Sequence, residues 1–220
     1  MRKFENVVKK PWGYEYVAYE NDECALWLLH IKNGHSTSMH CHPNKTTGLI
    51  LLEGTAKVSF MNDNFLLQPR HKIMIRKGLF HSTKAISKSG VSLFEVETPV
   101  DKFDLVRLKD SYGREGKPYE GVSHEYPKLE DCVKIQEPKK NKQHTYKIAD
   151  CSLRVCNIED TDFFKNFEDK RNIMFLKGGI VTEYGINVAG PGDILSCKVI
   201  KELIKVFKQV KNETIVMVFE

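Results

Sequence analysis

An internal repeat constrains the fold of this chain more than any other feature of the sequence. When residue 50 is aligned with residue 174, Ile50–Gly54 (ILLEG) falls on Met174–Gly178 (MFLKG), and Ile86–Val96 falls on Val210–Glu220. Between these segments, LLQPRHKIMI matches VAGPGDIL once the second copy is shortened by two residues. A repeat of this kind predicts two copies of one structural unit within 220 residues.

Short apolar runs bounded by turn residues predict that both copies are built from β-strands. Cys24–Gly34 is rich in bulky apolar residues and ends in the turn dipeptide Asn-Gly, and Ala56, Val58 and Phe60 alternate with other residues before the turn sequence MNDN. Evenly spaced strands with such turns are typical of a β-sandwich or a β-barrel. We therefore predict an all-β fold.

Two segments of the second copy are ambiguous. Val199–Val210 has apolar residues at helical spacing, but we predict a strand because its counterpart in the first copy is strand-like. Asp160–Asn172 fits either a short helix or a loop.

Asp104–Lys142 is polar and rich in proline, so we interpret it as an extended connector that contains at most a short helix or an edge strand.

Composition excludes several classes of protein. The net charge of +5 comes from basic residues scattered among acidic ones, which argues against nucleic-acid binding. No apolar leader begins the chain and no run is long enough to span a membrane. The six cysteines form no CxxC pair. These features predict a cytoplasmic protein with reduced thiols and no membrane partner.

Three histidines form a candidate metal site. His40 and His42 are two residues apart, so on a strand both imidazoles point to one face. His81 follows a turn at Gly78 and adds a third imidazole. Neutral imidazole is a common ligand for divalent metals, and we expect zinc, iron, manganese or nickel without distinguishing among them.

The residues around these histidines resemble the cupin family. Gly34–Gly54 is similar to the first cupin motif and Arg76–His81 to the second, with arginine where proline is usual. The resemblance implies two tandem cupin domains, which are jelly-roll β-barrels, with a metal held by His40, His42 and His81. Thr47 occupies the position at which the motif carries a glutamate ligand, which leaves three neutral ligands.

Four further segments narrow the resemblance. They are similar, in order and spacing, to the cupin domain of type II mannose-6-phosphate isomerases: Lys10–Tyr14, Leu52–Ala56, Phe94–Thr98 and Asp104–Arg114. The resemblance implies a metal-dependent isomerase or epimerase of a sugar phosphate or nucleotide-linked sugar in surface-polysaccharide synthesis, and a homodimer. The threonine at position 47 favours a sugar related to mannose 6-phosphate over that sugar itself.

The second copy lacks the histidines. At the repeat offset, Phe164, Asn166 and Lys205 replace them. Since the β-framework recurs without these ligands, the fold alone does not require them, and this favours a functional role in the first copy. We predict an N-terminal metal-binding cupin over residues 1–115, a connector over 116–144 and a degenerate cupin over 145–220.

Five side chains are candidates for binding a carbohydrate substrate: Trp12, Lys45, Arg76, Arg107 and Arg114. The tryptophan offers a stacking surface or a hydrophobic plug, and the cations offer phosphate contacts or surface salt bridges. The general base is not identifiable from the sequence. Two other functions remain open: a three-histidine cupin dioxygenase, and a non-catalytic sugar-binding protein.

Overall fold

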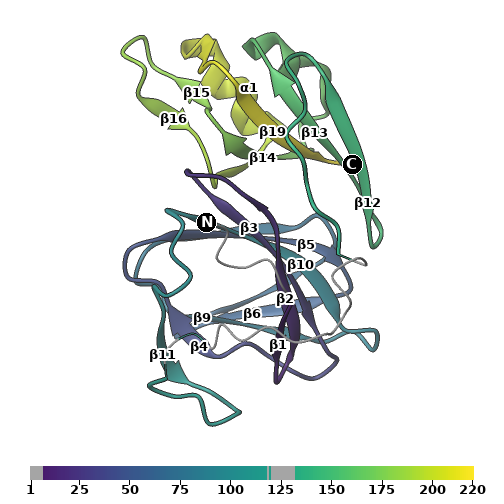
Figure 1. Cartoon of the computed structure of the whole chain (residues 1–220), viewed down its shortest axis with the longest axis vertical. Coiled ribbons are helices and arrows are strands. Elements are labelled where there is room, and N and C mark those ends of the chain that lie inside the picture. The colour runs from purple at the N-terminus through teal and green to yellow at the C-terminus, as the bar shows by residue number, and fades with distance from the viewer. Residues whose placement is uncertain (1–6, 118, 120–131) are drawn as a thin grey trace. The chain divides into compact units, whose positions relative to one another are not determined.

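The structure is a computed structural model that describes residues 7–117, 119 and 132–220. The chain divides into two compact units (Figure 1). Unit 1 comprises the described residues up to Glu20 and from Ala25 to Ile135, and unit 2 comprises Asn21–Cys24 and Gln136–Glu220. Strands dominate both units, and the predicted all-β class is confirmed. The described residues include no helix with the length and hydrophobicity needed to cross a membrane.

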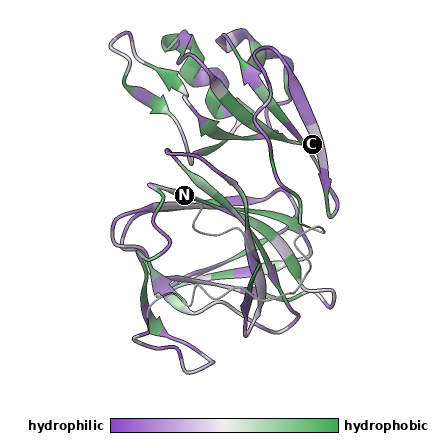
Figure 2. Cartoon of the chain, viewed as in Figure 1, coloured by the Kyte–Doolittle hydropathy of each residue, from purple (hydrophilic) through white to green (hydrophobic). Residues whose placement is uncertain are grey.

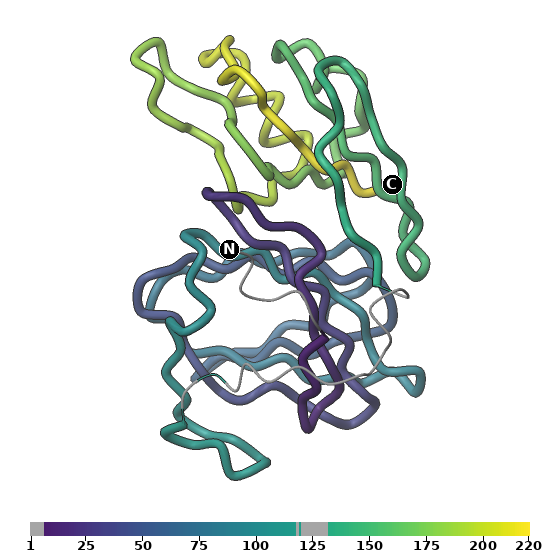
Figure 3. The backbone as a smooth tube through the Cα atoms, in the orientation of Figure 1, coloured from purple at the N-terminus to yellow at the C-terminus, as the bar shows by residue number. Residues whose placement is uncertain are grey.

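Unit 1 consists of two antiparallel sheets, with strand orders β1-β2-β3-β10-β5-β8 and β11-β4-β9-β6-β7. The strands of unit 1 are β1 (Val8–Lys10), β2 (Gly13–Glu20), β3 (Ala25–Ile31), β4 (Met39–Cys41), β5 (Thr46–Glu53), β6 (Ala56–Phe60), β7 (Asn64–Leu67), β8 (Lys72–Ile75), β9 (His81–Ala85), β10 (Val91–Thr98) and β11 (Val106–Lys109). Figure 3 shows the chain turning back on itself after β11. Because β11 is an edge strand paired with β4, the predicted connector begins with a short strand.

The core of unit 1 lies between its two sheets, since residues of both sheets form one buried cluster. Leu49 and Leu51 of β5 pack there with Val58 of β6, as expected for alternate residues of a strand. The same face of β10 changes character along its length. It begins with Val91 and Leu93 in the cluster and continues, two residues at a time, to buried glutamates at positions 95 and 97. One end of the barrel interior is therefore apolar and the other is polar.

Unit 2 contains a five-stranded sheet, β12-β13-β19-β14-β17, and a three-stranded sheet, β16-β15-β18. Its strands are β12 (Gln143–Ile148), β13 (Cys151–Ile158), β14 (Asn172–Lys177), β15 (Ile180–Val181), β16 (Asn187–Ala189), β17 (Ile194–Ser196), β18 (Gln209–Val210) and β19 (Thr214–Phe219). The central strand β19 is buried throughout and is coloured as hydrophobic in Figure 2. The core again includes residues from both sheets.

The repeat in the sequence corresponds to a repeat in strand order. The run β2-β3-β10-β5-β8 of unit 1 has the same order as β12-β13-β19-β14-β17 of unit 2. Gly54 and Gly178, which end the aligned motifs ILLEG and MFLKG, both have positive φ angles, 81° and 68°. A Cβ atom at Gly54 would lie 2.4 Å from the carbonyl oxygen of Gly90, so the glycine is required sterically as well.

The strand predicted over Val199–Val210 is wrong for most of its length. Helix α1 spans Cys197–Val206, and only the last two residues of the predicted strand belong to one, β18. Ser196 caps the helix by accepting a hydrogen bond from the backbone N–H of Val199. The ambiguous segment after β13 contains a 3-10 helix, η2 (Thr161–Asn166). The domain boundaries proposed from the sequence remain predictions, because part of the connector, including Pro118 and Pro127, lies outside the described residues.

Candidate functional site

Three imidazoles converge at the polar end of unit 1. His40 lies on β4, His42 follows that strand directly, and His81 begins β9, where its Cα atom pairs with that of His40. The ring centroid of His40 lies 5.0 Å from that of His42 and 4.4 Å from that of His81. One nitrogen from each ring lies within 4.8 Å of the others. The structure therefore brings the three predicted ligands together.

The backbone fixes the tautomer of all three rings. The Nδ1 atom of His40 lies 2.8 Å from the backbone carbonyl oxygen of Ser38. The Nδ1 atom of His42 lies 2.6 Å from the carbonyl oxygen of Asp104, and that of His81 lies 2.9 Å from the carbonyl oxygen of Leu79. A carbonyl oxygen only accepts hydrogen bonds, so each Nδ1 carries the proton and donates it. Each Nε2 then keeps a lone pair, the state in which imidazole binds a metal.

Burial keeps these imidazoles uncharged. It lowers the pKa of His42 to about 2 and that of His81 to about 4. The nearby Lys45 ammonium also lowers both pKa values, although less than burial does. The pKa of His40 lies well below its usual value, because of burial first and the neighbouring histidines second. All three rings are neutral at pH 7 and available as ligands.

The arrangement fits a bound metal ion. Nε2 of His42 is buried and has no hydrogen-bond partner among the residues that the structure describes. A buried polar atom without a partner costs free energy, and a metal ion would remove that cost. Thr47 on β5 is also buried, with its hydroxyl similarly unpaired within the described part of the chain. The ligand cluster of the described residues contains no carboxylate, so its donors are nitrogen atoms alone.

A cavity of about 50 Å³ adjoins His40 and His42, with room for a few water molecules. Its lining is rich in charge. The charged residues that line it are Lys10, Glu15, Lys45, Glu95, Lys102, Arg107 and Arg114. Five of these seven side chains are cationic, so the cavity favours an anionic ligand.

Four of the five predicted substrate-binding residues line this cavity, and one does not. Trp12, Lys45, Arg107 and Arg114 are all buried in its wall. The tryptophan also packs into the core. Arg76 is exposed in the turn after β8 and lies outside the lining.

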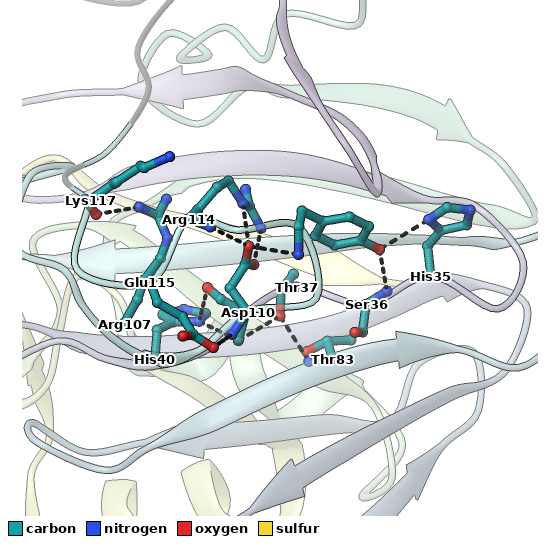
Figure 4. A network of polar contacts seen from close by, with 12 residues as sticks. His35, Ser36, Thr37, His40, Thr83, Arg107, Asp110, Arg114, Glu115 and Lys117 are labelled. Carbon is teal, nitrogen blue, oxygen red and sulfur yellow. Dashed lines mark hydrogen bonds and ion pairs between the residues drawn. The ribbon is translucent and has the colours of Figure 1, made fainter.

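The two arginines belong to a network of polar contacts around β11 (Figure 4). Arg107 lies opposite His40 in the β4–β11 pair and donates from Nη1 to the carbonyl oxygen of Lys117 over 2.5 Å. Arg114 forms an ion pair with Asp110, with Nη2 and Oδ1 2.6 Å apart. These contacts hold both guanidinium groups at the edge of the cavity.

The polar end also contains a buried set of carboxylates and lysines, of which the sequence indicated only Lys45. Lys102 Nζ lies 3.6 Å from Glu15 Oε1 and 3.8 Å from Glu95 Oε1, and it sits 3.9 Å above the ring of Trp27. Glu97 forms an ion pair with Lys45. The alternating glutamates in FEVET, on an otherwise apolar strand, are the sequence signal that could have revealed two of these groups.

The comparisons with known proteins match the half of the chain that carries the three histidines. Residues 1–110, half of the chain, match the family model described as mannose-6-phosphate isomerase C-terminal. The chain belongs to this family. The mannose-6-phosphate isomerase C-terminal region includes β1 to β11 and all three histidines.

Curated relatives match over the same half of the chain. Mannose-1-phosphate guanylyltransferase of Klebsiella pneumoniae is 26% identical over 109 residues, which are 49% of this chain and 23% of that protein. The alginate biosynthesis protein AlgA of Pseudomonas putida is 28% identical over 119 residues, 53% of this chain and 24% of that protein. The chain thus spans about a quarter of the length of the relatives it matches.

Solved structures also match part of the chain. A protein with a double-stranded β-helix domain from Klebsiella pneumoniae superimposes with a TM-score of 0.41 and 14% identity, over 44% of this chain and 79% of that one. A cupin-superfamily sugar phosphate isomerase from Silicibacter pomeroyi has a TM-score of 0.40 and 11% identity, over 43% of this chain and 64% of that one.

Proposed function

We propose that this protein is a metal-dependent isomerase or epimerase that acts on a sugar phosphate or nucleotide-linked sugar in the synthesis of surface polysaccharide. One observation carries the proposal: three neutral imidazoles direct unprotonated nitrogens toward one another beside a cavity with a cationic lining. Membership of the mannose-6-phosphate isomerase C-terminal family supports the same class of substrate.

The roles follow from the chemistry of the lining. His40, His42 and His81 would hold a divalent ion, and a bound ion polarises the carbonyl and hydroxyl oxygens of an open-chain sugar. Arg107 and Arg114 would bind the phosphate, because a planar guanidinium group offers paired donors to its oxygens. Both side chains are already oriented by the contacts around β11.

The test is elemental analysis of the native protein together with an isomerase assay on a panel of aldose and ketose phosphates. We expect about one ion per chain in the wild type and almost none in His40→Ala, because the variant removes one of three ligands. Activity should be lost with a chelator and restored by the metal. His71→Ala, which removes an exposed histidine elsewhere in unit 1, is the matched control and should keep both metal and activity.

Two results would contradict the proposal. A wild-type protein without metal that binds sugars equally well in chelator would be a non-catalytic sugar-binding protein. Uptake of oxygen by the iron-loaded protein, without interconversion of any sugar, would instead indicate the three-histidine dioxygenase.

We further propose that the protein acts in the cytoplasm as a homodimer. Strand β7 supports the second part of this proposal, because it is an edge strand that exposes Phe65 and Leu66. Light scattering at micromolar concentration tests it, and a mass equal to the 25.4 kDa chain would contradict it.

A further inference from the structure

Three buried glutamates lie at the polar end of unit 1, and two of them are fully engaged. Glu97 accepts a hydrogen bond from Trp27 Nε1 over 3.0 Å and forms an ion pair with Lys45. Glu15 accepts a hydrogen bond from the hydroxyl of Tyr119 and lies close to two lysines. Neither carboxylate can turn toward a ligand without losing these partners.

Glu95 differs from the other two. Among the described residues, its carboxylate has a single charged contact, Lys102 Nζ, at 3.8 Å from Oε1. This separation is longer than a hydrogen bond, so the lysine balances the charge without occupying the oxygen lone pairs. Glu95 also lines the cavity, whereas Glu97 does not. It is therefore the glutamate best placed to accept a proton from a bound molecule.

The fold places this carboxylate and the imidazoles on different walls of one cavity. Glu95 lies on β10 of the first sheet, directly opposite Trp27 and Leu49, both of which face the core. His40 and His42 reach the same cavity from the second sheet. A small molecule in the cavity would contact the carboxylate from one sheet and the ligand cluster from the other.

We propose that Glu95 is the base that moves a proton between two neighbouring carbons of the open-chain sugar, an inference that rests on the proposed isomerase function. The carboxylate takes the proton from C2 of an aldose, and the electrons of the C2–H bond form the C1=C2 double bond while those of the carbonyl move to O1. The O2 hydroxyl proton passes to O1. Glu95 then returns its proton to C1 as the O2 electrons form the new carbonyl, so the ketose has the atoms and electrons of the aldose.

The surroundings of Glu95 suit this role. Burial raises its pKa, and the charges of Glu97 and Glu15 raise it further, while those of Lys102 and Lys45 act in the opposite direction. A more basic carboxylate abstracts a proton from carbon more readily than an exposed one. The step needs no oxidant and no second reactant.

The test compares Glu95→Gln with wild-type protein in the metal-loaded state. We expect kcat to fall by about 10²- to 10⁴-fold, the usual contribution of a general base, while metal content stays at the wild-type level. Incorporation of solvent deuterium at C1 of the ketose should fall by the same factor. Glu53→Gln, a half-buried glutamate at the far end of β5, is the matched control and should retain wild-type kcat.

The outcomes separate this proposal from the one on which it rests. If wild-type protein interconverts no sugar, the proposed function fails and the role of Glu95 fails with it. If the wild type is active and Glu95→Gln equals it, only the role of Glu95 is overturned. Should Glu95→Gln not fold, Glu95→Asp keeps the charge and displaces the carboxylate by one methylene. It should lower kcat at least about tenfold with a nearly unchanged KM, and full activity would overturn the proposal.

Discussion

At the scale of single residues, the charge state of the buried histidines makes the metal-free protein sensitive to acid. The folded state holds His40, His42 and His81 neutral, since burial lowers the pKa of each. In the unfolded chain the same rings bind protons below about pH 6.5. The unfolded state therefore binds more protons in mild acid, and the free energy of unfolding falls as the pH falls.

Denaturant unfolding of the metal-free protein between pH 7 and pH 4 should show this loss. We expect the free energy of unfolding to fall by about 1.4 kcal/mol per pH unit for each histidine that stays neutral in the folded state. His81 contributes only down to about pH 4, where its own pKa lies. His81→Asn should reduce the slope by about that amount over the same range. A slope equal to that of the wild type would contradict the assigned charge state.

Thr47 stands where the cupin motif carries a glutamate ligand, and its replacement tests what the position does. Thr47→Glu puts a carboxylate into a buried site directly opposite Glu97 in the β5–β10 pair. Two like charges in that position destabilise the metal-free protein. If the new carboxylate also reaches the ion, metal binding offsets this repulsion, so we expect zinc to raise the melting temperature more in this variant than in wild type.

The matched control is Thr47→Gln, which has the size of the glutamate variant without its charge. Melting curves with zinc and with chelator give the shift for all three proteins. Equal shifts in the glutamate and glutamine variants would show that position 47 does not face the ion.

The sequence was informative about the site where neighbours in the chain are neighbours in space. His40 and His42 share a face because they are two residues apart, and that spacing alone indicated them. Lys102 and Glu15 could not be paired from the sequence, because 87 positions separate them and only the strand order joins them. Arg76 lies away from the cavity because it belongs to an exposed turn, and no local pattern distinguishes it from the arginines that line the wall.

At the scale of secondary structure, the two copies differ most where the first carries its histidines. At the repeat offset, β4 corresponds to the 3-10 helix η2, and the start of β9 corresponds to the end of α1. Phe164, which replaces His40, is completely buried in the core of unit 2. The sulfur of Cys197 in α1 lies 3.2 Å from the carbonyl oxygen of Phe164 in η2, so the two helices pack together. Apolar packing fills the place that the ligands occupy in unit 1.

The burial pattern of α1 gives a test of this packing. Ile200 is completely buried in the core of unit 2, whereas Val199 at the preceding position is 45% exposed. We expect Ile200→Ala to lower the free energy of unfolding by about 2–5 kcal/mol, through lost burial and an unfilled cavity. Val199→Ala, the matched control, should change it by no more than about 0.5 kcal/mol. Urea unfolding measures both, and similar losses would contradict the orientation of the helix.

The error in predicting α1 has a physical cause. The apolar residues of Val199–Val210 have helical spacing, but the repeat argued for a strand, and we gave the repeat more weight. Equivalence between copies holds for the central strands, which must pair with the same neighbours in each sheet. It does not extend to segments outside that ladder, where the local pattern decides.

At the scale of the whole molecule, the asymmetry between the units predicts where a metal ion acts. The ligand cluster lies entirely in unit 1. A ligand stabilises the folded state of the part to which it binds, by an amount set by its concentration and affinity. Hydrogen exchange should therefore slow in β4, β5 and β9 when zinc is added. Exchange in β14 and β19 should stay the same, and equal protection of both units would contradict this prediction.

The bonds that orient His40, His42 and His81 all end on main-chain carbonyl oxygens. Every amino acid supplies such an oxygen, so mutation of Ser38, Leu79 or Asp104 changes a side chain without deleting the acceptor. During evolution the side chains of the cavity wall can therefore change, and with them the substrate preference, while the orientation of the three imidazole rings is retained. Changes in specificity and conservation of the ligand geometry are independent of each other in this barrel.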